Sequence, residues 1–392
     1  MNRVVIVGAS AGGLCTAEAL RRRGFEGVIT LVGEEPDRPY DRPPLSKQVL
    51  AGQWEPDRLA LRSDAALDDL DLDLRLGVSA TGLDTTRRVV TLADDSRVPY
   101  DALVVATGVR PRRLPGCPDG VHVLRTVADA VALRERLRPG RRLVIVGAGF
   151  VGAEVAATAR ALGVEVTMLE SAPVPLALAV GEDAGRFLTR LHRDHGVRIH
   201  TGAVVTEITA AGVRLADGTH IPADDVLVAV GSVPNTDWLT GSGLTVHNGL
   251  VCDEYCAAAP GVYGVGDVAR WHNPLFGTDM RIEHRTNAAE QGMAVAHNLL
   301  NREAPKPFAP VPYFWSDQYD VKIQAYGNLR DHDEVLVLDS DLAARQLLVV
   351  YRTGDRLTGV LAAGKSPKVL RAWRAFIATG ASWRSALAAA AA

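Results

Sequence analysis

Two glycine-rich segments constrain the fold of this chain more than any other feature, because each joins an apolar stretch to a run with helical periodicity. The clearer one opens the segment 143–170, where residues 143–146 and 164–169 are predicted strands around a helix that Gly163 ends. Its glycines have the G-x-G-x-x-G spacing: Gly147, Gly149 and Gly152. They allow a tight turn, the approach of a pyrophosphate and close helix–strand packing. The segment therefore predicts a βαβ unit that binds a dinucleotide.

A carboxylate follows this unit at the distance expected for ribose recognition. Glu170 ends the second predicted strand, 18 residues after Gly152. Hydrogen bonds from ribose hydroxyls to a charged acceptor are worth about 1.5–3 kcal/mol each, whereas a 2′-phosphate would face a like charge. No Lys or Arg lies between Glu170 and Arg186 to bind such a phosphate. The pattern predicts NADH rather than NADPH.

A second copy of the fingerprint opens the chain. Residues 4–7 and 28–32 are predicted strands around the sequence GASAGG and a helix that Gly24 ends. Ser10 takes the place of the second glycine, so its Cβ crowds the pyrophosphate. Glu34 follows Gly13 by 21 residues, which is close to the expected spacing of the ribose-binding acid. A second dinucleotide site is predicted here, with a nucleotide fold that no longer binds as the alternative.

The second unit is inserted into the first, and this predicts two dinucleotides bound face to face, one held throughout and one exchanging. That is the layout of a flavin–nicotinamide oxidoreductase. The predicted fold class is α/β, with two nested Rossmann-like dinucleotide-binding domains of the glutathione-reductase-like kind and a C-terminal α+β domain. The expected domains are an FAD-binding domain (1–109 and 232–304), an NADH-binding domain (110–231) and the C-terminal domain (305–392).

The last part of the chain has its own pattern. Four prolines between residues 305 and 312 indicate a linker. Strand-like runs follow at 335–338, 347–351 and 356–361, with a final helix from about Pro367. The Ala-rich end, 386–392, is expected to be frayed or disordered.

Composition limits the classes of function. The 392 residues carry a net charge of −3, which argues against a general nucleic-acid or membrane-surface role. The four cysteines do not form a disulfide framework in a chain of this length, and no metal site is predicted. No apolar run of about 18 residues could span a bilayer, and no leader precedes the first strand. A soluble cytoplasmic protein is expected.

The chain resembles a known family, the NADH-dependent ferredoxin reductases of oxygenase and cytochrome P450 systems, which are FAD enzymes. The resemblance covers nearly the whole chain and rests on seven motifs in the family's order. They are GASAGG with Glu34, YDRPPLSK (40–47), ATG (106–108), GAGFVGAE (147–154), GVGD (264–267), RIEHRTNAAEQG (281–292) and YFWSDQYD (313–320).

The resemblance implies that the first fingerprint holds FAD. The implied FAD contacts are Gly8, Ser10, Ala11, Gly12, Gly13, Glu34, Lys47, Ala80, Thr107, Gly108, Arg125, Gly266, Asp267, Arg285 and Trp315. Three residues have implied catalytic roles. Lys47 would reach the flavin near N5 and pair with Glu154, and Trp315 would lie against the flavin or the nicotinamide pocket. The alternatives are a turn, a helix-surface carboxylate and a core indole.

The second fingerprint would hold NADH. The implied contacts are Gly147, Gly149, Phe150, Val151, Gly152, Glu154, Glu170, Val230 and Gly231. Two positions depart from the family's pattern. Leu178 lies in a loop where relatives often carry an Arg, which bears on the strength of NADH binding. Arg285 replaces an apolar or aromatic residue, and an inward-pointing guanidinium is predicted to raise the flavin potential.

The same motifs indicate where the electrons leave. The loop around Ser46 and Lys47 has no redox Cys, so two-electron exchange with a thiol is not expected, and electrons should leave FAD singly. The chain has no Cys₄ set for a [2Fe–2S] cluster, so the predicted partner is a separate [2Fe–2S] ferredoxin that serves an oxygenase or cytochrome P450. Arg42, Arg58 and Arg62 are candidates for its docking face, and a solvated mixed-charge surface is the alternative.

Two other functions stay open. A reductase of the same fold could use rubredoxin, a quinone or oxygen as its acceptor. An FAD-binding protein could also sense NADH without sustained turnover. Ser10 and Leu178 favour the second alternative slightly, whereas Lys47, Glu154 and Trp315 argue against it.

Overall fold

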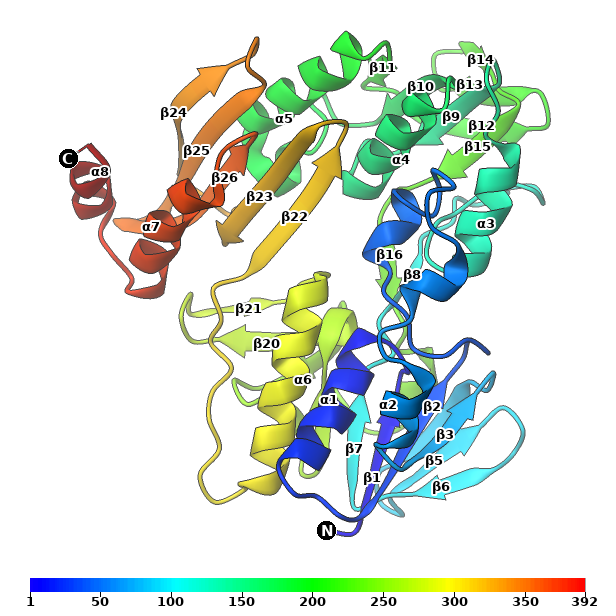
Figure 1. The fold of residues 1–392 in the computed structure, drawn as a ribbon, viewed down its shortest axis with the longest axis vertical. Coiled ribbons are helices and arrows are strands. Elements are labelled where there is room, and N and C mark those ends of the chain that lie inside the picture. Colours follow the sequence, from blue (N-terminus) through cyan, green and yellow to red (C-terminus); the bar gives the residue numbers. More distant parts are fainter. Residues whose placement is uncertain (392) are drawn as a thin grey trace. The chain divides into compact units, whose positions relative to one another are not determined.

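The computed structural model describes residues 1–391, which fold as two compact units (Figure 1). The first unit consists of Met1–Asp41, Asp57–Arg110 and Val233–Pro310. The second consists of Arg42–Pro56, Pro111–Ser232 and the chain from Val311 onward. The chain passes between them near two short strands, β8 (Val109–Pro111) and β16 (Ser232–Pro234).

A six-stranded sheet forms the centre of the first unit, in the order β18-β19-β7-β1-β2-β3. All neighbours are parallel except β18 and β19. The strands are β1 (Arg3–Val7), β2 (Val28–Gly33), β3 (Leu72–Leu76), β7 (Ala102–Val105), β18 (Ala257–Ala259) and β19 (Val262–Gly264). The strand β1 is almost wholly apolar because a central parallel strand is buried on both faces.

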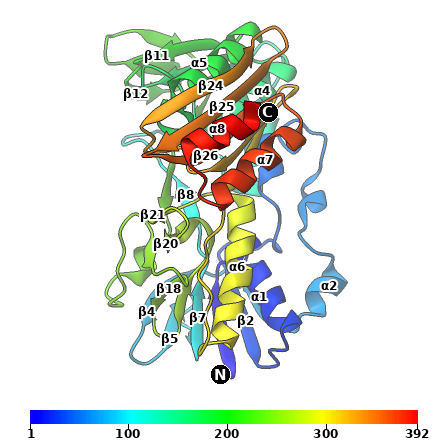
Figure 2. The same cartoon turned by 90° about the vertical axis from the view of Figure 1, so that its left-hand side faces the viewer.

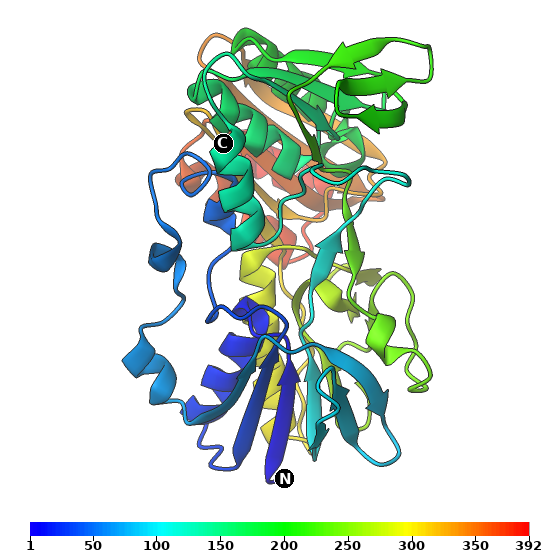
Figure 3. The same cartoon turned by 90° about the vertical axis from the view of Figure 1, so that its right-hand side faces the viewer.

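Two helices of this unit, α1 (Ala11–Arg22) and α6 (Arg285–Leu300), pack side by side (Figures 1 and 3). Two three-stranded sheets complete the unit, together with the short helix α2 (Asp64–Asp68). The sheets contain β4 (Ala80–Asp84), β5 (Val89–Leu92) and β6 (Arg97–Pro99), and β17 (Leu250–Cys252), β20 (Ala269–Asn273) and β21 (Thr278–Met280).

The second unit contains the inserted βαβ segment. A parallel sheet in the order β11-β10-β9-β15 is joined by an antiparallel sheet of β12, β13 and β14. The strands are β9 (Arg142–Val146), β10 (Glu165–Glu170), β11 (Arg198–Thr201), β12 (Val205–Thr209), β13 (Gly212–Leu215), β14 (His220–Pro222) and β15 (Asp225–Val228). The helices are α3 (Val127–Arg136), α4 (Phe150–Ala161) and α5 (Ala177–Asp194). Both sequence fingerprints therefore form the predicted strand–turn–helix units.

The C-terminal part of the second unit is an antiparallel sheet in the order β22-β23-β26-β25-β24. Its strands are β22 (Tyr313–Gln318), β23 (Val321–Gly327), β24 (Glu334–Asp341), β25 (Gln346–Thr353) and β26 (Arg356–Ala363). Helices α7 (Pro367–Ala378) and α8 (Trp383–Ala391) lie on one face (Figure 2). Apolar side chains of α5 pack on the other.

The three predicted strand-like runs are β24, β25 and β26, whereas β22 and β23 were not predicted. The expectation for the end of the chain was wrong. The Ala-rich end is not disordered up to residue 391, because α8 continues through it and Ala386 is fully buried. Alanine has the highest helix propensity, and packing of one face stabilises a helix this short. Ala392, the last residue of that expectation, lies outside the described residues. The three-domain boundaries stay a prediction.

Candidate active site

Two glycines of the first turn (Gly8–Gly13) lie so close to neighbouring backbone that a side chain would not fit. Gly8 has φ +123°, and a Cβ there would lie 2.0 Å from the carbonyl oxygen of Ala106. A Cβ on Gly13 would lie 1.9 Å from the carbonyl oxygen of Gly8. No larger residue fits at either position, so β1, β7 and α1 approach one another as closely as the fingerprint predicts.

The second turn (Gly147–Gly152) repeats this packing. Gly147 has φ +102°, and a Cβ there would lie 2.4 Å from the carbonyl oxygen of Ala229. A Cβ on Gly152 would lie 2.2 Å from the carbonyl oxygen of Gly147. The two turns therefore have the same local structure. In each, the first glycine packs against the residue that follows a neighbouring strand, which is β7 in the first turn and β15 in the second.

The middle position of each turn is the N-cap of a helix, and here the two turns differ. A Cβ on Gly149 would have no atom within 4 Å, so packing does not explain this glycine. Ser10 caps α1 in an extended conformation, but its side chain makes no capping hydrogen bond. The first N–H groups of α1 and α4 have no partner within their own helix, and they are suited to bind phosphate. Both turns fit a dinucleotide pyrophosphate.

Substitution of Gly149 separates ligand contact from packing. The Gly149→Ala protein is expected to keep its stability within about 1 kcal/mol, because the new methyl group meets open space. Its affinity for NADH is expected to fall about tenfold or more, since the methyl group occupies the approach of the pyrophosphate. Unfolding in urea and an NADH binding titration measure the two effects. Unchanged NADH binding would contradict the assignment.

Glu170 is already held in place by the backbone around it. Its Oε2 accepts a hydrogen bond from the N–H of Ala148 at 3.0 Å, and its Oε1 accepts one from the N–H of Ala172 at 2.9 Å. Each carboxylate oxygen can accept a further hydrogen bond. The side chain is therefore preorganised beside the second turn to bind ribose hydroxyls. Leu178 is 89% exposed, and as an apolar side chain it offers no positive charge to NADH.

The other predicted FAD contacts in the first unit gather near the carboxyl ends of its strands. Thr107 and Gly108 follow β7, where the Thr107 hydroxyl donates to the carbonyl oxygen of Asn235 at 2.8 Å. Gly266 has φ +74° and donates its N–H to Gln291 at 2.8 Å, which fixes the short turn that carries Asp267. Ala80 begins β4, and Glu34 is exposed directly after β2. Their roles stay predictions.

Arg285 has a carboxylate partner that the sequence did not reveal. At the start of α6, its Nε donates to Asp41 Oδ1 at 2.6 Å, and the side chain is 26% exposed. An ion pair reduces the net positive charge that the guanidinium presents to its surroundings. The predicted rise in flavin potential from Arg285 is therefore expected to be small.

A buried Lys–Glu pair lies in the second unit. Lys47 Nζ lies 2.8 Å from Glu154 Oε2, and the two side chains are 13% and 10% exposed. Ser46 donates to the same oxygen at 2.5 Å, and Ser316 donates to Oε1 at 2.8 Å. Glu154 thus accepts three hydrogen bonds, which fix its orientation. The predicted pairing of Lys47 with Glu154 is observed, whereas Ser46 and Ser316 were not predicted as partners.

Two aromatic residues predicted at the cofactors lie in the same unit. Trp315 is on β22 and stacks with Tyr313, with ring centroids 5.9 Å apart. Phe150 begins α4 and packs edge-on against Phe314 at 4.9 Å. Val151 is 44% exposed, as a side chain that meets a ligand would be.

The remaining predicted contacts of the second unit lie in loops. Arg125 precedes the capping box of α3, and its N–H donates to Asp129 at 2.9 Å. Val230 is partly buried and Gly231 is exposed after β15. The predicted cofactor contacts of these three residues stay predictions.

The three candidate docking arginines do not form one described patch. Arg42 belongs to the second unit and donates to the carbonyl oxygen of Arg125 at 2.7 Å. Arg58 and Arg62 belong to the first unit, where Arg62 pairs with Glu18 at 2.6 Å. An arginine with a carboxylate partner has less charge available for a protein partner, so Arg62 is a weak candidate.

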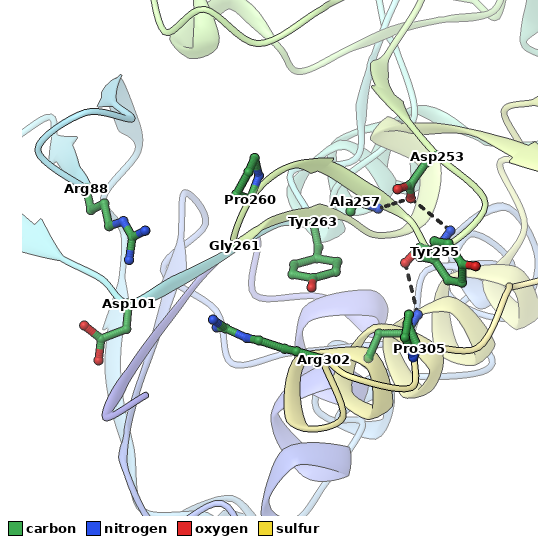
Figure 4. A pocket seen from close by; sticks show the side chains of 11 residues that line it. Arg88, Asp101, Asp253, Tyr255, Ala257, Pro260, Gly261, Tyr263, Arg302 and Pro305 are labelled. Atoms are coloured by element: carbon green, nitrogen blue, oxygen red, sulfur yellow. Dashed lines mark hydrogen bonds between the residues drawn. The ribbon is translucent and has the colours of Figure 1, made fainter.

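A cavity of about 310 Å³ lies in the first unit (Figure 4). Asp101 and Gly261, which line it, precede β7 and β19. Asp253, also in the lining, accepts from the N–H groups of Tyr255 and Ala257. The cavity therefore lies at the amino ends of parallel strands, opposite the edge where ligands of such sheets bind. It is not part of the first turn.

Two of the four cysteines are buried and offer little redox chemistry. Cys252 and Cys256 are buried free thiols, and burial raises the pKa of Cys256 to about 12 and that of Cys252 well above its ordinary value. A thiol that stays protonated is a poor nucleophile. None of the helices among residues 1–391 combines the length and hydropathy needed to cross a bilayer.

Comparisons with known proteins identify the family of this chain. The sequence pattern of the family described as pyridine nucleotide-disulphide oxidoreductase matches residues 2–292. The chain belongs to this family. A second pattern, described as reductase C-terminal, matches residues 313–392. Membership of this family implies FAD and NAD as cofactors.

Two similar proteins within this group are named as reductases. The chain is 38% identical over 375 residues to putidaredoxin reductase CamA of Pseudomonas putida, an alignment that covers 92% of this chain and 88% of the relative. It is 39% identical over 333 residues to the ferredoxin–NAD(+) reductase component of the p-cumate 2,3-dioxygenase system of Pseudomonas putida, covering 84% and 82%.

A solved structure gives the same result. The crystal structure of the covalent putidaredoxin reductase–putidaredoxin complex aligns with a TM-score of 0.92 at 34% identity, covering 100% of this chain and 99% of that one. The predicted fold class and family are confirmed.

Several residues around Glu154 were missed from the sequence. Ser316 and Gln318 alternate along β22 and are buried, at 1% and 0% exposed, and His192 on α5 is 2% exposed. Alternating polar residues inside an apolar strand are an available sign of a polar network. Their partners lie more than a hundred residues away in the sequence, so no local pattern identifies them.

Burial of His192 predicts a dependence of stability on pH. Desolvation, opposed by the hydrogen bond to Gln318, lowers the pKa of His192 from 6.5 to about 4. The unfolded state therefore binds more protons than the folded state between about pH 4 and 6.5, so stability falls as the pH drops through this window. The expected loss from this side chain at pH 4.5 is on the order of 2–3 kcal/mol. Urea unfolding at pH 7.5 and 4.5 should show a smaller difference for His192→Gln than for the wild type, and an equal difference would contradict it.

Proposed function

We propose that this chain is an NADH-dependent ferredoxin reductase that passes electrons from NADH, through FAD, to a [2Fe–2S] ferredoxin serving an oxygenase or cytochrome P450. The observation that carries this proposal is the pair of matching glycine turns with Glu170 held beside the second. Its relatives are named as reductases of ferredoxins in such systems. Glu170 supports NADH as the electron donor, since it would repel a 2′-phosphate.

The chain's own residues bind and orient the two dinucleotides in this proposal. The N–H groups that open α1 and α4 bind the pyrophosphates. Lys47 and Glu154 remain paired in a buried site, where Glu154 receives hydrogen bonds from Ser46 and Ser316. Bound FAD would supply the chemistry that links two-electron oxidation of NADH to one-electron transfer. Glu154 would hold Lys47 in place beside the flavin, and, as for Arg285, the ion pair reduces the net positive charge that Lys47 presents to its surroundings.

The proposed acceptor is a separate iron–sulfur protein. Burial keeps Cys252 and Cys256 protonated, which argues against an electron relay through either thiol. A carrier that accepts one electron at a time fits the transfer of single electrons from the flavin. A cytoplasmic location and the three-domain boundaries are part of the same proposal, as is the implied role of Trp315.

A reductase assay with and without an added carrier tests the acceptor. The FAD-loaded protein is mixed with NADH and cytochrome c, and a plant-type [2Fe–2S] ferredoxin or putidaredoxin is then added. The expected result is a low rate alone and a rate that rises with the concentration of at least one carrier. A rate that responds to rubredoxin or a quinone, but to no [2Fe–2S] protein, would overturn the proposed partner.

A further inference from the structure

A chain of hydrogen bonds leads away from Glu154 into the interior of the second unit. Ser316 Oγ lies 2.8 Å from Glu154 Oε1, and Gln318 Nε2 lies 3.1 Å from Ser316 Oγ. Gln318 Oε1 lies 3.0 Å from His192 Nε2, and His192 Nδ1 lies 2.8 Å from the hydroxyl of Tyr319. Three side chains, joined by four hydrogen bonds, thus connect the Lys47–Glu154 pair to Tyr319.

The donors in this chain all point toward Glu154. The carboxylate can only accept, so the single proton of Ser316 is directed to it, and Ser316 Oγ must accept from the amide of Gln318. The Gln318 carbonyl oxygen then faces His192 and requires an N–H at Nε2. Neutral histidine has its proton on one nitrogen, so Nδ1 must accept the proton of the Tyr319 hydroxyl.

The opposite arrangement would remove one of the three hydrogen bonds to Glu154. If His192 carried its proton on Nδ1, Nε2 would become an acceptor and Gln318 would turn its NH₂ group toward it. The Gln318 oxygen would then face Ser316 and take the proton that Glu154 now receives. Glu154 would keep its bonds to Ser46 and Lys47 on Oε2 and lose the one on Oε1. The tautomer of His192 therefore determines whether Glu154 Oε1 receives the hydrogen bond from Ser316.

We propose that His192 is a positioning residue for Glu154, and that the Tyr319 hydroxyl sets the tautomer on which this positioning depends. The inference rests on the proposed function only in giving Glu154 a part in NADH oxidation. The amide of Gln318 does not exchange protons readily, so the chain orients Glu154 and does not conduct protons.

The surroundings of His192 favour this role. Its pKa, lowered to about 4 by burial, keeps the ring neutral at pH 7, where a tautomer is defined. His195 is the other titratable group that faces it, and its ring stacks on Tyr319 with centroids 3.6 Å apart. Burial also raises the pKa of Tyr319, so its hydroxyl remains a donor.

Two substitutions remove one link each and little else. Ser316→Ala removes the hydroxyl that donates to Glu154. Tyr319→Phe removes only the hydroxyl at the far end and keeps the ring that stacks on His195. Leu188→Ala is the matched control, because Leu188 packs in the same α5 core and has no polar group.

The first measurement is ¹⁵N NMR of the histidine rings in the oxidised, FAD-loaded protein at pH 7. Assignment of the His192 signals uses the spectrum of His192→Gln. Wild-type His192 is expected to carry its proton on Nε2, and Tyr319→Phe is expected to show a mixture of tautomers. Leu188→Ala is expected to match the wild type. A proton on Nδ1 in the wild type would overturn the proposal.

The second measurement is the rate of flavin bleaching by NADH under anaerobic conditions, compared as a double-mutant cycle. Ser316→Ala is expected to lower the limiting rate about tenfold with the apparent Kd for NADH within about twofold, because a hydrogen bond to a charged group is lost. Tyr319→Phe should lower it less, and the double variant should be no slower than Ser316→Ala. Effects that multiply would overturn the proposal. A wild-type protein whose flavin NADH does not bleach would instead refute the proposed function, while leaving the NMR result intact.

Discussion

A Gly13→Ala protein is expected to be purified without FAD. The added methyl group would lie 1.9 Å from the carbonyl oxygen of Gly8, and because this contact is with backbone, a side-chain adjustment cannot relieve it. Overpacking a buried contact costs about 1–3 kcal/mol, and a clash with backbone falls at the upper end. Helix α1 must therefore move away from β1, which takes the N–H groups of the first turn away from the pyrophosphate. Flavin absorbance per protein and the Tm measure the result.

Gly82→Ala is the matched control in the same unit. A Cβ at Gly82 would meet Thr91 at 3.8 Å, an ordinary contact, so FAD content and Tm should stay close to those of the wild type. If Gly13→Ala retained full FAD with an unchanged Tm, the first turn would not have the close packing described here.

Glu170→Ala is expected to lose most of the preference for NADH. Two hydrogen bonds from ribose hydroxyls to a carboxylate, worth about 1.5–3 kcal/mol each, correspond to an NADH Kd that rises about 100-fold or more. NADPH binding should improve at the same time, because the like charge is gone. Anaerobic reduction by each nucleotide at several concentrations gives both apparent constants.

Glu165→Ala provides the control on the same strand, since Glu165 is exposed and pairs only with Arg198 at 3.2 Å among the described residues. Its NADH and NADPH constants should match those of the wild type. Glu170→Ala with an unchanged ratio of the two constants would show that selectivity lies elsewhere.

The sequence predicted what depends on local spacing. Glycines at fixed intervals between two apolar strands allow few conformations, so both turns and Glu170 were located correctly from the sequence alone. The Lys47–Glu154 pair came from the family resemblance, because nothing in the local pattern connects residues 107 positions apart.

What the sequence did not reveal depends on contacts between distant segments. Asp41 beside Arg285 changes the expected effect of that arginine, and the two are 244 residues apart. The Ser316–Gln318–His192 chain joins a strand to a helix by the same kind of long-range packing. The strand β22 was missed because its polar residues interrupt the apolar pattern that predicts a buried strand, and those same residues form the network.

The most direct test of the central claim is an anaerobic titration of the purified protein with NADH and, separately, with NADPH, followed in the flavin bands. The account predicts bound FAD that bleaches rapidly with about one equivalent of NADH and slowly with NADPH. Protein that neither carries nor binds flavin, or flavin that stays oxidised with NADH, would contradict it.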